Sequence, residues 1–249
     1  VCQLTRQDAY FGLLKNCMIV GMGKCDLGRC ISVTFLFWMF HLPGSVAVTL
    51  HQTDDFQSLS TEGWSVGPPH PQPPSIVADE GPTGIGDHHL LIQASGVDGP
   101  GGRLASFNST QWGGDYLAAG VSGVEVMLRN VGNTPLTIGL AIDGGGGRFA
   151  TLDMVTLEPR SLWTAASFSL RPNDLQPAGG TDATASLRSV SELRFVNSAD
   201  PAFKAVVAPG ALAIDDVTAV PEISAPIALA ATFLFFAALT RRRPRSAQR

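Results

Sequence analysis

Cysteine is scarce in this chain and absent from its central region. Only 4 of the 249 residues are cysteine, and Cys2, Cys17, Cys25 and Cys30 all precede residue 47. The rest of the chain therefore has no thiol for a disulfide framework or a thiolate metal site. A region of about 170 residues without cross-links has to be held together by its hydrophobic core, and a domain of that length can bury enough surface to do so.

Basic residues are scarce in the same region. Between positions 48 and 222 there are 19 Asp and Glu residues against 8 Lys and Arg residues, a net charge of −11, whereas the whole chain has a net charge of −4. Affinity for nucleic acid rests largely on Lys and Arg neutralising phosphates, so we expect no nucleic-acid partner. An acidic surface suits cation binding, or simple solubility outside the cell.

Recognisable catalytic motifs are missing as well. The chain has no Gly-x-Ser-x-Gly nucleophile elbow. The glycine run at 143–147 follows one candidate strand and precedes another, which predicts a hairpin turn, because phosphate-binding loops lead into helices. Asp87, His88 and His89 form a dense polar cluster at the start of an expected strand, but adjacent strand residues point to opposite faces and could not easily chelate one ion. We therefore expect a protein without enzymatic activity.

The N-terminal segment has the parts of a secretory signal. A positively charged stretch precedes an apolar run at 31–42, and Ser45-Val46-Ala47 offers small residues for cleavage. We expect a signal peptide over 22–47, removed after Ala47, with 1–21 as an untranslated or disordered leader. An N-terminal transmembrane helix is the alternative, although twelve apolar residues are too few to span a bilayer comfortably.

The C-terminal segment combines an apolar span with a basic tail. The span at 223–240 carries no charge before its end and approaches the length that crosses a bilayer. The tail at 241–249 should stay in the cytoplasm by the positive-inside bias, which places the body of the protein on the other side of the membrane. Its stop-transfer residues are Arg241, Arg242, Arg243 and Arg245.

The order of these C-terminal parts resembles the PEP-CTERM sorting signal of Gram-negative bacteria. The box Val220-Pro221-Glu222 lies directly against the apolar span, and Ile223 stands where the family has proline. The resemblance covers the segment 220–249 and implies an exosortase-like partner that cleaves near the box. It also implies a membrane-tethered intermediate, then delivery to the cell surface or the exopolysaccharide layer. An ordinary C-terminal anchor would use the same residues and remains the alternative.

The region between the two ends, 48–219, has the pattern of strands and turns. Val124, Val126 and Leu128 alternate with polar or larger residues, as expected of a strand with one buried face. Many short strands over this length predict an all-β, antiparallel two-sheet sandwich. The expected strands are 89–94, 104–108, 124–130, 136–142, 148–152, 163–170, 192–196 and 212–219. The expected inward residues are Val124, Val126, Leu128, Ile138, Leu140, Phe168, Phe195 and Ile214.

Several short motifs in this region resemble bacterial jelly-roll domains of the galactose-binding and carbohydrate-binding-module type. The resemblance rests on Asp54-Asp55-Phe56, Gly63-Trp64, Leu193-Arg194-Phe195 and Ile214-Asp215-Asp216-Val217. It implies a structural Ca²⁺ held by acidic residues and backbone carbonyls, since this ion takes six to eight oxygen ligands. The candidate ligands are Asp54, Asp55, Asp215 and Asp216. Paired aspartates at strand ends are also common as solvated turn residues.

A sugar-binding site needs flat rings beside hydrogen-bonding groups, and the segment 111–116 has both. Its candidate ligand-binding residues are Trp112, Asp115 and Tyr116. Core packing is the alternative for each tryptophan of the chain. For Trp163, at the start of an expected strand, core packing is favoured, whereas for Trp112, in a glycine-rich loop, both interpretations stay open.

Three functions fit these observations. The first is a non-catalytic cell-surface or extracellular-matrix protein with a structural or adhesive sandwich. The second is a carbohydrate-binding module that recognises exopolysaccharide, and the third is a secreted hydrolase. A fold alone does not choose among them. An exposed aromatic platform would favour the second, and paired carboxylates at glycosidase separation would favour the third.

Overall fold

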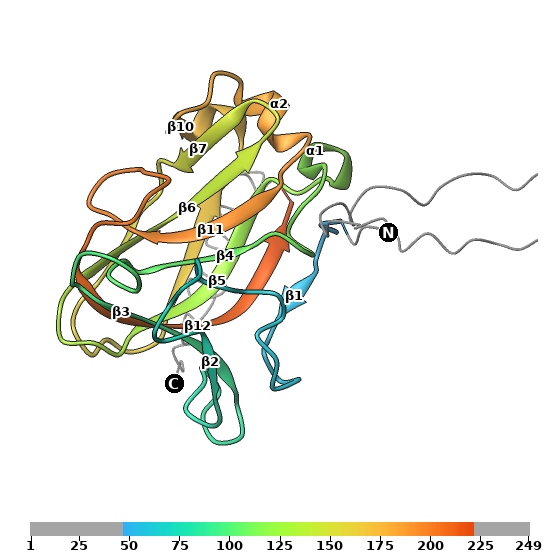
Figure 1. Ribbon diagram of the computed structural model, residues 1–249. Coiled ribbons are helices and arrows are strands. Elements are labelled where there is room, and N and C mark those ends of the chain that lie inside the picture. Colours follow the sequence, from blue (N-terminus) through green and yellow to red (C-terminus); the bar gives the residue numbers. More distant parts are fainter. Residues whose placement is uncertain (1–46, 222–249) are drawn as a thin grey trace, which may run out of the picture. The chain divides into compact units, whose positions relative to one another are not determined.

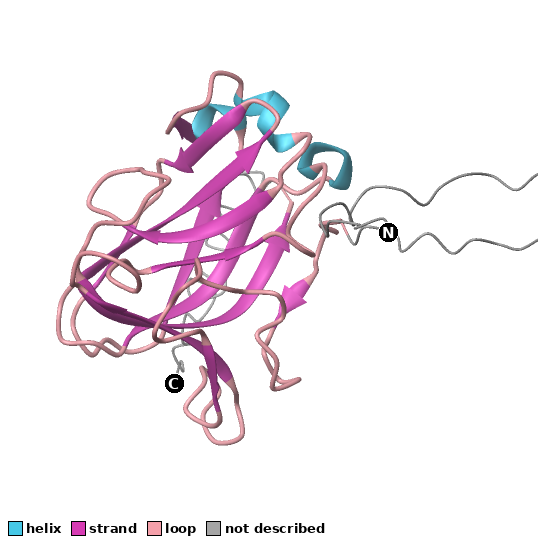
Figure 2. Cartoon of the chain, viewed as in Figure 1, coloured by secondary structure: helices cyan, strands magenta, loops and turns pink. Residues whose placement is uncertain are grey.

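The computed structural model describes residues 47–221 (Figure 1). The predicted signal peptide, the apolar span and the arginine tail lie outside these residues. Strands are the main regular elements of the described fold, and its short helices lie at one end (Figure 2). No helix within 47–221 is long and apolar enough to cross a membrane.

The strands form two antiparallel sheets, here named sheet A and sheet B. Sheet A has the order β2 (Ser75–Val77), β3 (His89–Ser95), β12 (Pro209–Val220), β5 (Gly123–Asn130) and β9 (Thr164–Ser169), with β1 (Thr53–Asp54) also pairing with β12. Sheet B has the order β10 (Leu175–Pro177), β7 (Gly147–Thr151), β6 (Leu136–Gly144), β11 (Glu192–Asn197) and β4 (Ala105–Asn108), with β8 (Val155–Leu157) pairing with β6.

The strand order is that of a jelly roll. Its main strands in chain order are β3, β4, β5, β6, β7, β9, β11 and β12. Sheet A has the neighbours β3, β12, β5 and β9, which are the first, eighth, third and sixth of these strands. Sheet B has the neighbours β4, β11, β6 and β7, which are the second, seventh, fourth and fifth. This alternation between sheets is the double Greek key of an eight-stranded jelly roll. The predicted all-β, antiparallel two-sheet sandwich is confirmed.

One hydrophobic core fills the space between the inner faces of the sheets. The predicted inward residues are all among its buried members, none more than 3% exposed: Val124, Val126, Leu128, Ile138, Leu140, Phe168, Phe195 and Ile214. Period-two alternation located them because the opposite face of each strand meets solvent or a loop. Each of the eight expected strands is present, with ends that differ by at most three residues from those expected. The short strands β1, β2, β8 and β10 were not expected.

The short helices are capped by aspartates and pack at the ends of the strands. Helix α1 (Tyr116–Ala119) is capped by Asp115, α2 (Ala183–Leu187) is capped by Asp182, and η1 (Pro172–Asp174) is a single 3₁₀ turn. The predicted hairpin turn joins β6 to β7. A Cβ at Gly144 or Gly146 would overlap the backbone of the α2 segment, so close packing of α2 on the hairpin requires glycine there.

Candidate ligand-binding groove

The predicted aromatic ligand site belongs to the core, which corrects the prediction. Trp112 and Tyr116 are fully buried, and the Tyr116 hydroxyl donates a hydrogen bond to the Trp112 carbonyl at 2.9 Å. Asp115 accepts a hydrogen bond from the Ala118 amide at 2.9 Å and so caps α1. Neither ring is available to stack on a sugar, so core packing is the correct interpretation of Trp112.

Asp54 also has an internal role rather than the predicted metal-binding one. Its side chain is 6% exposed, and its Oδ2 accepts hydrogen bonds from the indole Nε1 of Trp64 at 2.7 Å and of Trp112 at 2.6 Å. Burial raises the pKa of Asp54, while the two indole donors and Gln111 act against that rise. The carboxylate therefore joins two core tryptophans that lie far apart in the sequence.

The other predicted metal ligands gather at a bulge in β12. The register between β12 and β5 shifts between Asp215 and Thr218, and Asp216 has a positive φ of 50°. Besides burial, the charges of Asp55 and Asp87 raise the pKa of Asp216. The structure thus brings Asp55, Asp215 and Asp216 together and adds Asp87, which the sequence placed only at the start of a strand.

Asp215 is the most unusual member of this acidic group. It is 1% exposed, and its Oδ2 has no hydrogen-bond partner within the described part of the chain. Burial, together with the neighbouring carboxylates, raises the pKa of Asp215 to about 8, although the Asp216 amide donates to its Oδ1 at 2.8 Å. An orphaned buried carboxylate oxygen is a costly feature that a cation or a proton would relieve.

The acidic group does not form a complete metal site by side chains alone. Among residues 47–221, no three or more His, Cys, Asp or Glu side chains gather closely enough to hold an ion. The free Oδ2 of Asp215 nevertheless fits a hard cation such as Ca²⁺. Backbone carbonyls and water would have to supply the other ligands, as the jelly-roll resemblance implies.

The outward side of sheet A carries a groove of about 430 Å³. The groove runs over β5, β9 and the bulged part of β12, so its floor is made of paired strands rather than loops. We name it the β5–β9 groove. Its outward-facing side chains are Glu125, Met127, Ala165, Ser167, Asp216 and Thr218.

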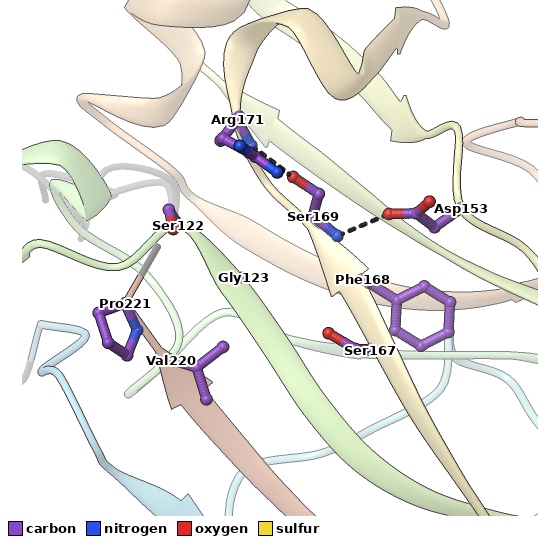
Figure 3. Close-up of a pocket in the computed structure, with 9 residues that line it drawn as sticks. All are labelled: Ser122, Gly123, Asp153, Ser167, Phe168, Ser169, Arg171, Val220 and Pro221. Carbon is purple, nitrogen blue, oxygen red and sulfur yellow. Dashed lines mark hydrogen bonds between the residues drawn. The ribbon is translucent and has the colours of Figure 1, made fainter. Parts of the chain in front are cut away.

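A smaller hollow of about 180 Å³ shares the lining residue Ser167 with the groove, and Figure 3 shows the residues that line this hollow. Two hydrogen bonds order its wall: the Ser169 amide donates to Asp153 Oδ2 at 2.9 Å, and Arg171 Nε donates to Ser169 Oγ at 3.2 Å. Arg171 also pairs with Asp174 at 3.0 Å. The hollow therefore presents hydroxyl and charged groups at one end of sheet A.

The predicted sorting box begins at the edge of this hollow. Val220 is the last residue of β12, is 9% exposed and lines the hollow together with Pro221 (Figure 3). The Val220 carbonyl accepts a hydrogen bond from the Ser122 amide at 3.0 Å. The first box residue is thus held in the sheet, and Glu222 lies outside the described residues.

The remaining part of the outer face of sheet A is covered. Trp163 is half-buried, its Nε1 donates to the Glu80 carbonyl at 2.8 Å, and its ring meets the His89 ring edge-on at 5.3 Å between centroids. Arg129 pairs with the Glu80 carboxylate at 3.6 Å. Burial is the main reason why the pKa of His89 is lowered. Because β12 and β5 separate β3 from β9, these two rings bridge the outer face.

Trp163 therefore lies on the outer face of sheet A, and its expected core position is wrong. The signal was present in the sequence: Ala166 and Phe168 point inward, so residues at odd positions of β9, and Trp163 before them, point outward. Ala165 of the groove is two residues further along the same face, about 7 Å away along the strand. Trp163 is thus the aromatic side chain beside the β5–β9 groove.

Comparison with known proteins supports the fold. No protein-family model matches the chain, and no curated protein sequence matches it. An exo-β-agarase structure matches with a TM-score of 0.50 and 11% identity, over 70% of this chain and 26% of the agarase chain. A family 11 carbohydrate-binding module from Clostridium thermocellum, in complex with a β-1,3-1,4-mixed-linked tetrasaccharide, matches with a TM-score of 0.45 and 16% identity, over 71% of this chain and 99% of the module. A non-crystalline-cellulose-specific module, CBM28, matches with a TM-score of 0.42 and 12% identity, over 70% and 98% of the two chains.

The agarase match shows a shared sandwich fold. This chain spans about a quarter of the agarase. The agarase match carries no information on the β5–β9 groove or on the acidic residues around Asp215.

Proposed function

We propose that this chain is an exported, non-catalytic polysaccharide-binding protein whose ligand lies in the β5–β9 groove. The observation that carries the proposal is the open groove of about 430 Å³ on a floor of paired strands. Within residues 47–221 no loop covers this groove, which leaves it open to a polysaccharide. A floor of strands holds polar groups in fixed positions, which lowers the ordering cost of binding.

The lining of the groove suits a sugar polymer. Ser167 and Thr218 offer hydroxyls, Glu125 offers a carboxylate, and Met127 offers an apolar surface for ring C–H groups. Trp163 adds a half-buried aromatic ring at the covered end. The smaller hollow that shares Ser167 with the groove lengthens it, as an extended polymer would need.

The fold comparison supports this proposal by analogy. A domain of this fold occurs in a chain described as an exo-β-agarase. The same fold can host unrelated functions, so the groove itself remains the main support. The absence of enzymatic activity is part of the proposal, and release of reducing ends from a bound polysaccharide would contradict it.

Export and sorting form the second part of the proposal. The described residues end at Val220 and Pro221, which line the smaller hollow, and the PEP-CTERM-like signal begins there. An exosortase-like enzyme would act close to Glu222 and release the sandwich from a membrane tether to the cell surface or matrix. Expression with and without exosortase tests this part, and a membrane-bound mass that is identical in both hosts and retains the arginine cluster would contradict it.

Calcium binding at Asp215 is a third, separable part. We propose that Ca²⁺ contacts the free Oδ2 of Asp215, which would neutralise a buried charge and stabilise the β12 bulge. Thermal unfolding of the full chain should show a higher midpoint in Ca²⁺ than in Mg²⁺. Asp215→Asn should lose that difference, and Asp98→Asn, an exposed control, should keep it. An equal response of the wild type to both ions would contradict the proposal.

A blocking substitution tests the groove directly. Ala165→Arg places a long side chain on the exposed floor of the β5–β9 groove, and Thr156→Arg adds the same charge on exposed β8 of the other sheet. On a panel of immobilised polysaccharides, we expect the full chain to be retained by at least one polymer. Ala165→Arg should weaken retention about tenfold or more, and Thr156→Arg should not. Retention by no polymer, or equal retention of both variants, would overturn the proposal.

A further inference from the structure

The carboxylates of the groove are unpaired, whereas the basic residues beside them are not. Glu125 and Asp216 both line the β5–β9 groove, and neither carboxylate has a hydrogen-bond or ion-pair partner among residues 47–221. Arg129, on the same face of β5, is paired with Glu80 at 3.6 Å. The groove therefore has a net negative charge that no neighbouring cation of the described fold neutralises.

Two further carboxylates, Asp55 and Asp87, add to the negative field of the groove, whereas Asp215 behind it is protonated near pH 7 because burial raises its pKa to about 8. Asp215 is on the outward side of β12, opposite Met127 of the groove lining, and it is 1% exposed with its Oδ2 unpartnered. Asp55 and Asp87 are close enough to act on both Asp215 and Asp216. Carboxylates gathered on low-dielectric walls concentrate cations locally and repel anions.

We propose that the β5–β9 groove selects polysaccharides that carry protonated amino groups, such as partly de-N-acetylated amino-sugar polymers. This inference rests on the proposed polysaccharide-binding function and specifies its ligand class. Ammonium groups would pair with Glu125 and Asp216, while the hydroxyls of Ser167 and Thr218 would hydrogen-bond to ring hydroxyls. Uronic-acid or sulfated polymers would be repelled by the same carboxylates.

Two other mechanisms could also lead an acidic protein to bind a charged polysaccharide. The domain is acidic as a whole, so a cationic polymer could be attracted without any site. A divalent cation at the acidic group could instead bridge to an anionic polymer. General attraction predicts that removal of any surface carboxylate has the same effect, and a cation bridge predicts binding to alginate only when Ca²⁺ is present.

The experiment compares chitosan, chitin, agarose and alginate as ligands for the full chain, each with and without Ca²⁺. The variants are Glu125→Gln and Asp216→Asn, and the matched control is Glu158→Gln, an exposed carboxylate on the β8–β9 connection. Asn tolerates the positive φ of Asp216, so this variant preserves the bulge. Circular dichroism and thermal unfolding confirm that each variant is folded.

We expect the wild type to bind chitosan more tightly than chitin or agarose, with affinity that falls as salt increases. Glu125→Gln and Asp216→Asn should each weaken chitosan binding about twofold to fivefold, and Glu158→Gln should leave it unchanged. An equal loss in all three variants overturns the inference, as does alginate binding that requires Ca²⁺. Binding to chitin or agarose with no preference for chitosan overturns the inference but leaves the proposed function intact. No binding to any of the four polymers, or to the wider polysaccharide panel, would overturn both.

Discussion

The strands of both sheets alternate inward and outward residues, yet the outer face of one sheet is covered and that of the other is partly open. On sheet B, the connection between β11 and β12 places the Phe203 ring against the guanidinium groups of Arg148 and Arg194, 4.5 and 4.2 Å from the ring centre. Beneath it lies a second small apolar cluster of Ala141, Ala150, Val196 and Ala205. On sheet A, no segment between residues 47 and 221 covers the β5–β9 groove in this way.

The difference follows from the residues that point outward. Sheet B presents small apolar side chains such as Ala141 and Ala150, which would leave an exposed apolar patch unless a loop packed on them. Sheet A presents Glu125, Ser167 and Thr218, which water can solvate. A face with outward polar side chains can therefore stay open to a ligand. A face with outward alanines has to be covered by a loop for stability.

The largest expected effect concerns the core that both faces share. Asp54→Ala leaves the Nε1 groups of Trp64 and Trp112 buried without an acceptor, and Trp64 also packs on Phe195 of sheet B at 5.0 Å. We expect the free energy of unfolding to fall by about 3 kcal/mol, measured by urea denaturation. Asp55→Ala, at the exposed neighbour, should change it by less than about 0.5 kcal/mol. Equal effects would mean that the contact of Asp54 with the two tryptophans does not stabilise the core.

The next prediction removes the cover from sheet B. Phe203→Ala loses the ring that lies against Arg148 and Arg194 and exposes the small apolar cluster, so we expect a loss of about 2 kcal/mol in unfolding free energy. Polysaccharide binding should not change, because the groove is on the other sheet. Lys204→Ala, the exposed neighbour, is the control for both measurements. A binding change in Phe203→Ala alone would place the ligand site on sheet B.

The third prediction uses the buried carboxyl on sheet A. The pKa of Asp215 is raised to about 8 in the folded state, while its ordinary value is 3.8, so the folded chain holds this proton more tightly than the unfolded chain. The stabilisation is complete below pH 4 and is lost as the pH rises through 8. Asp216, Asp87 and Asp55 face this group and act in the same direction.

Asp215→Asn imitates the protonated acid and should therefore flatten this pH dependence. We expect the variant to be more stable than the wild type at pH 7 in the absence of Ca²⁺, by a difference that grows from pH 4 to pH 8, and equally stable near pH 4. Denaturation curves between pH 4 and pH 8 provide the measurement. A parallel pH dependence in both proteins would show that Asp215 is ionised in the folded state.

The sequence located the core strands and the inner face but only part of the site, for physical reasons. Strands of four or more residues can show a period-two pattern, whereas β1 and β2 are too short to show one. The burial of Trp112 depends on a hydrogen bond to Asp54, 58 residues away, which no local pattern reveals. Trp163 could have been placed outward from the alternation of β9, and Asp87 joins the acidic group only through the folded path of its loop.

The smallest expected effect concerns the covered part of sheet A. Trp163→Phe keeps an aromatic ring beside His89 but removes the Nε1 donor to the Glu80 carbonyl, so the loop between β2 and β3 loses one anchor. The bond is exposed, and its loss should lower the unfolding free energy by less than about 1 kcal/mol. Local opening should respond more clearly than global stability, because such loops open without unfolding the core. We expect faster amide hydrogen exchange between residues 79 and 88, with unchanged exchange in the 198–208 connection over sheet B. If both loops exchange as in the wild type, the hydrogen bond from Trp163 to the Glu80 carbonyl does not hold the loop between β2 and β3 in place. The cover of sheet A would then not depend on Trp163, whereas the cover of sheet B depends on Phe203.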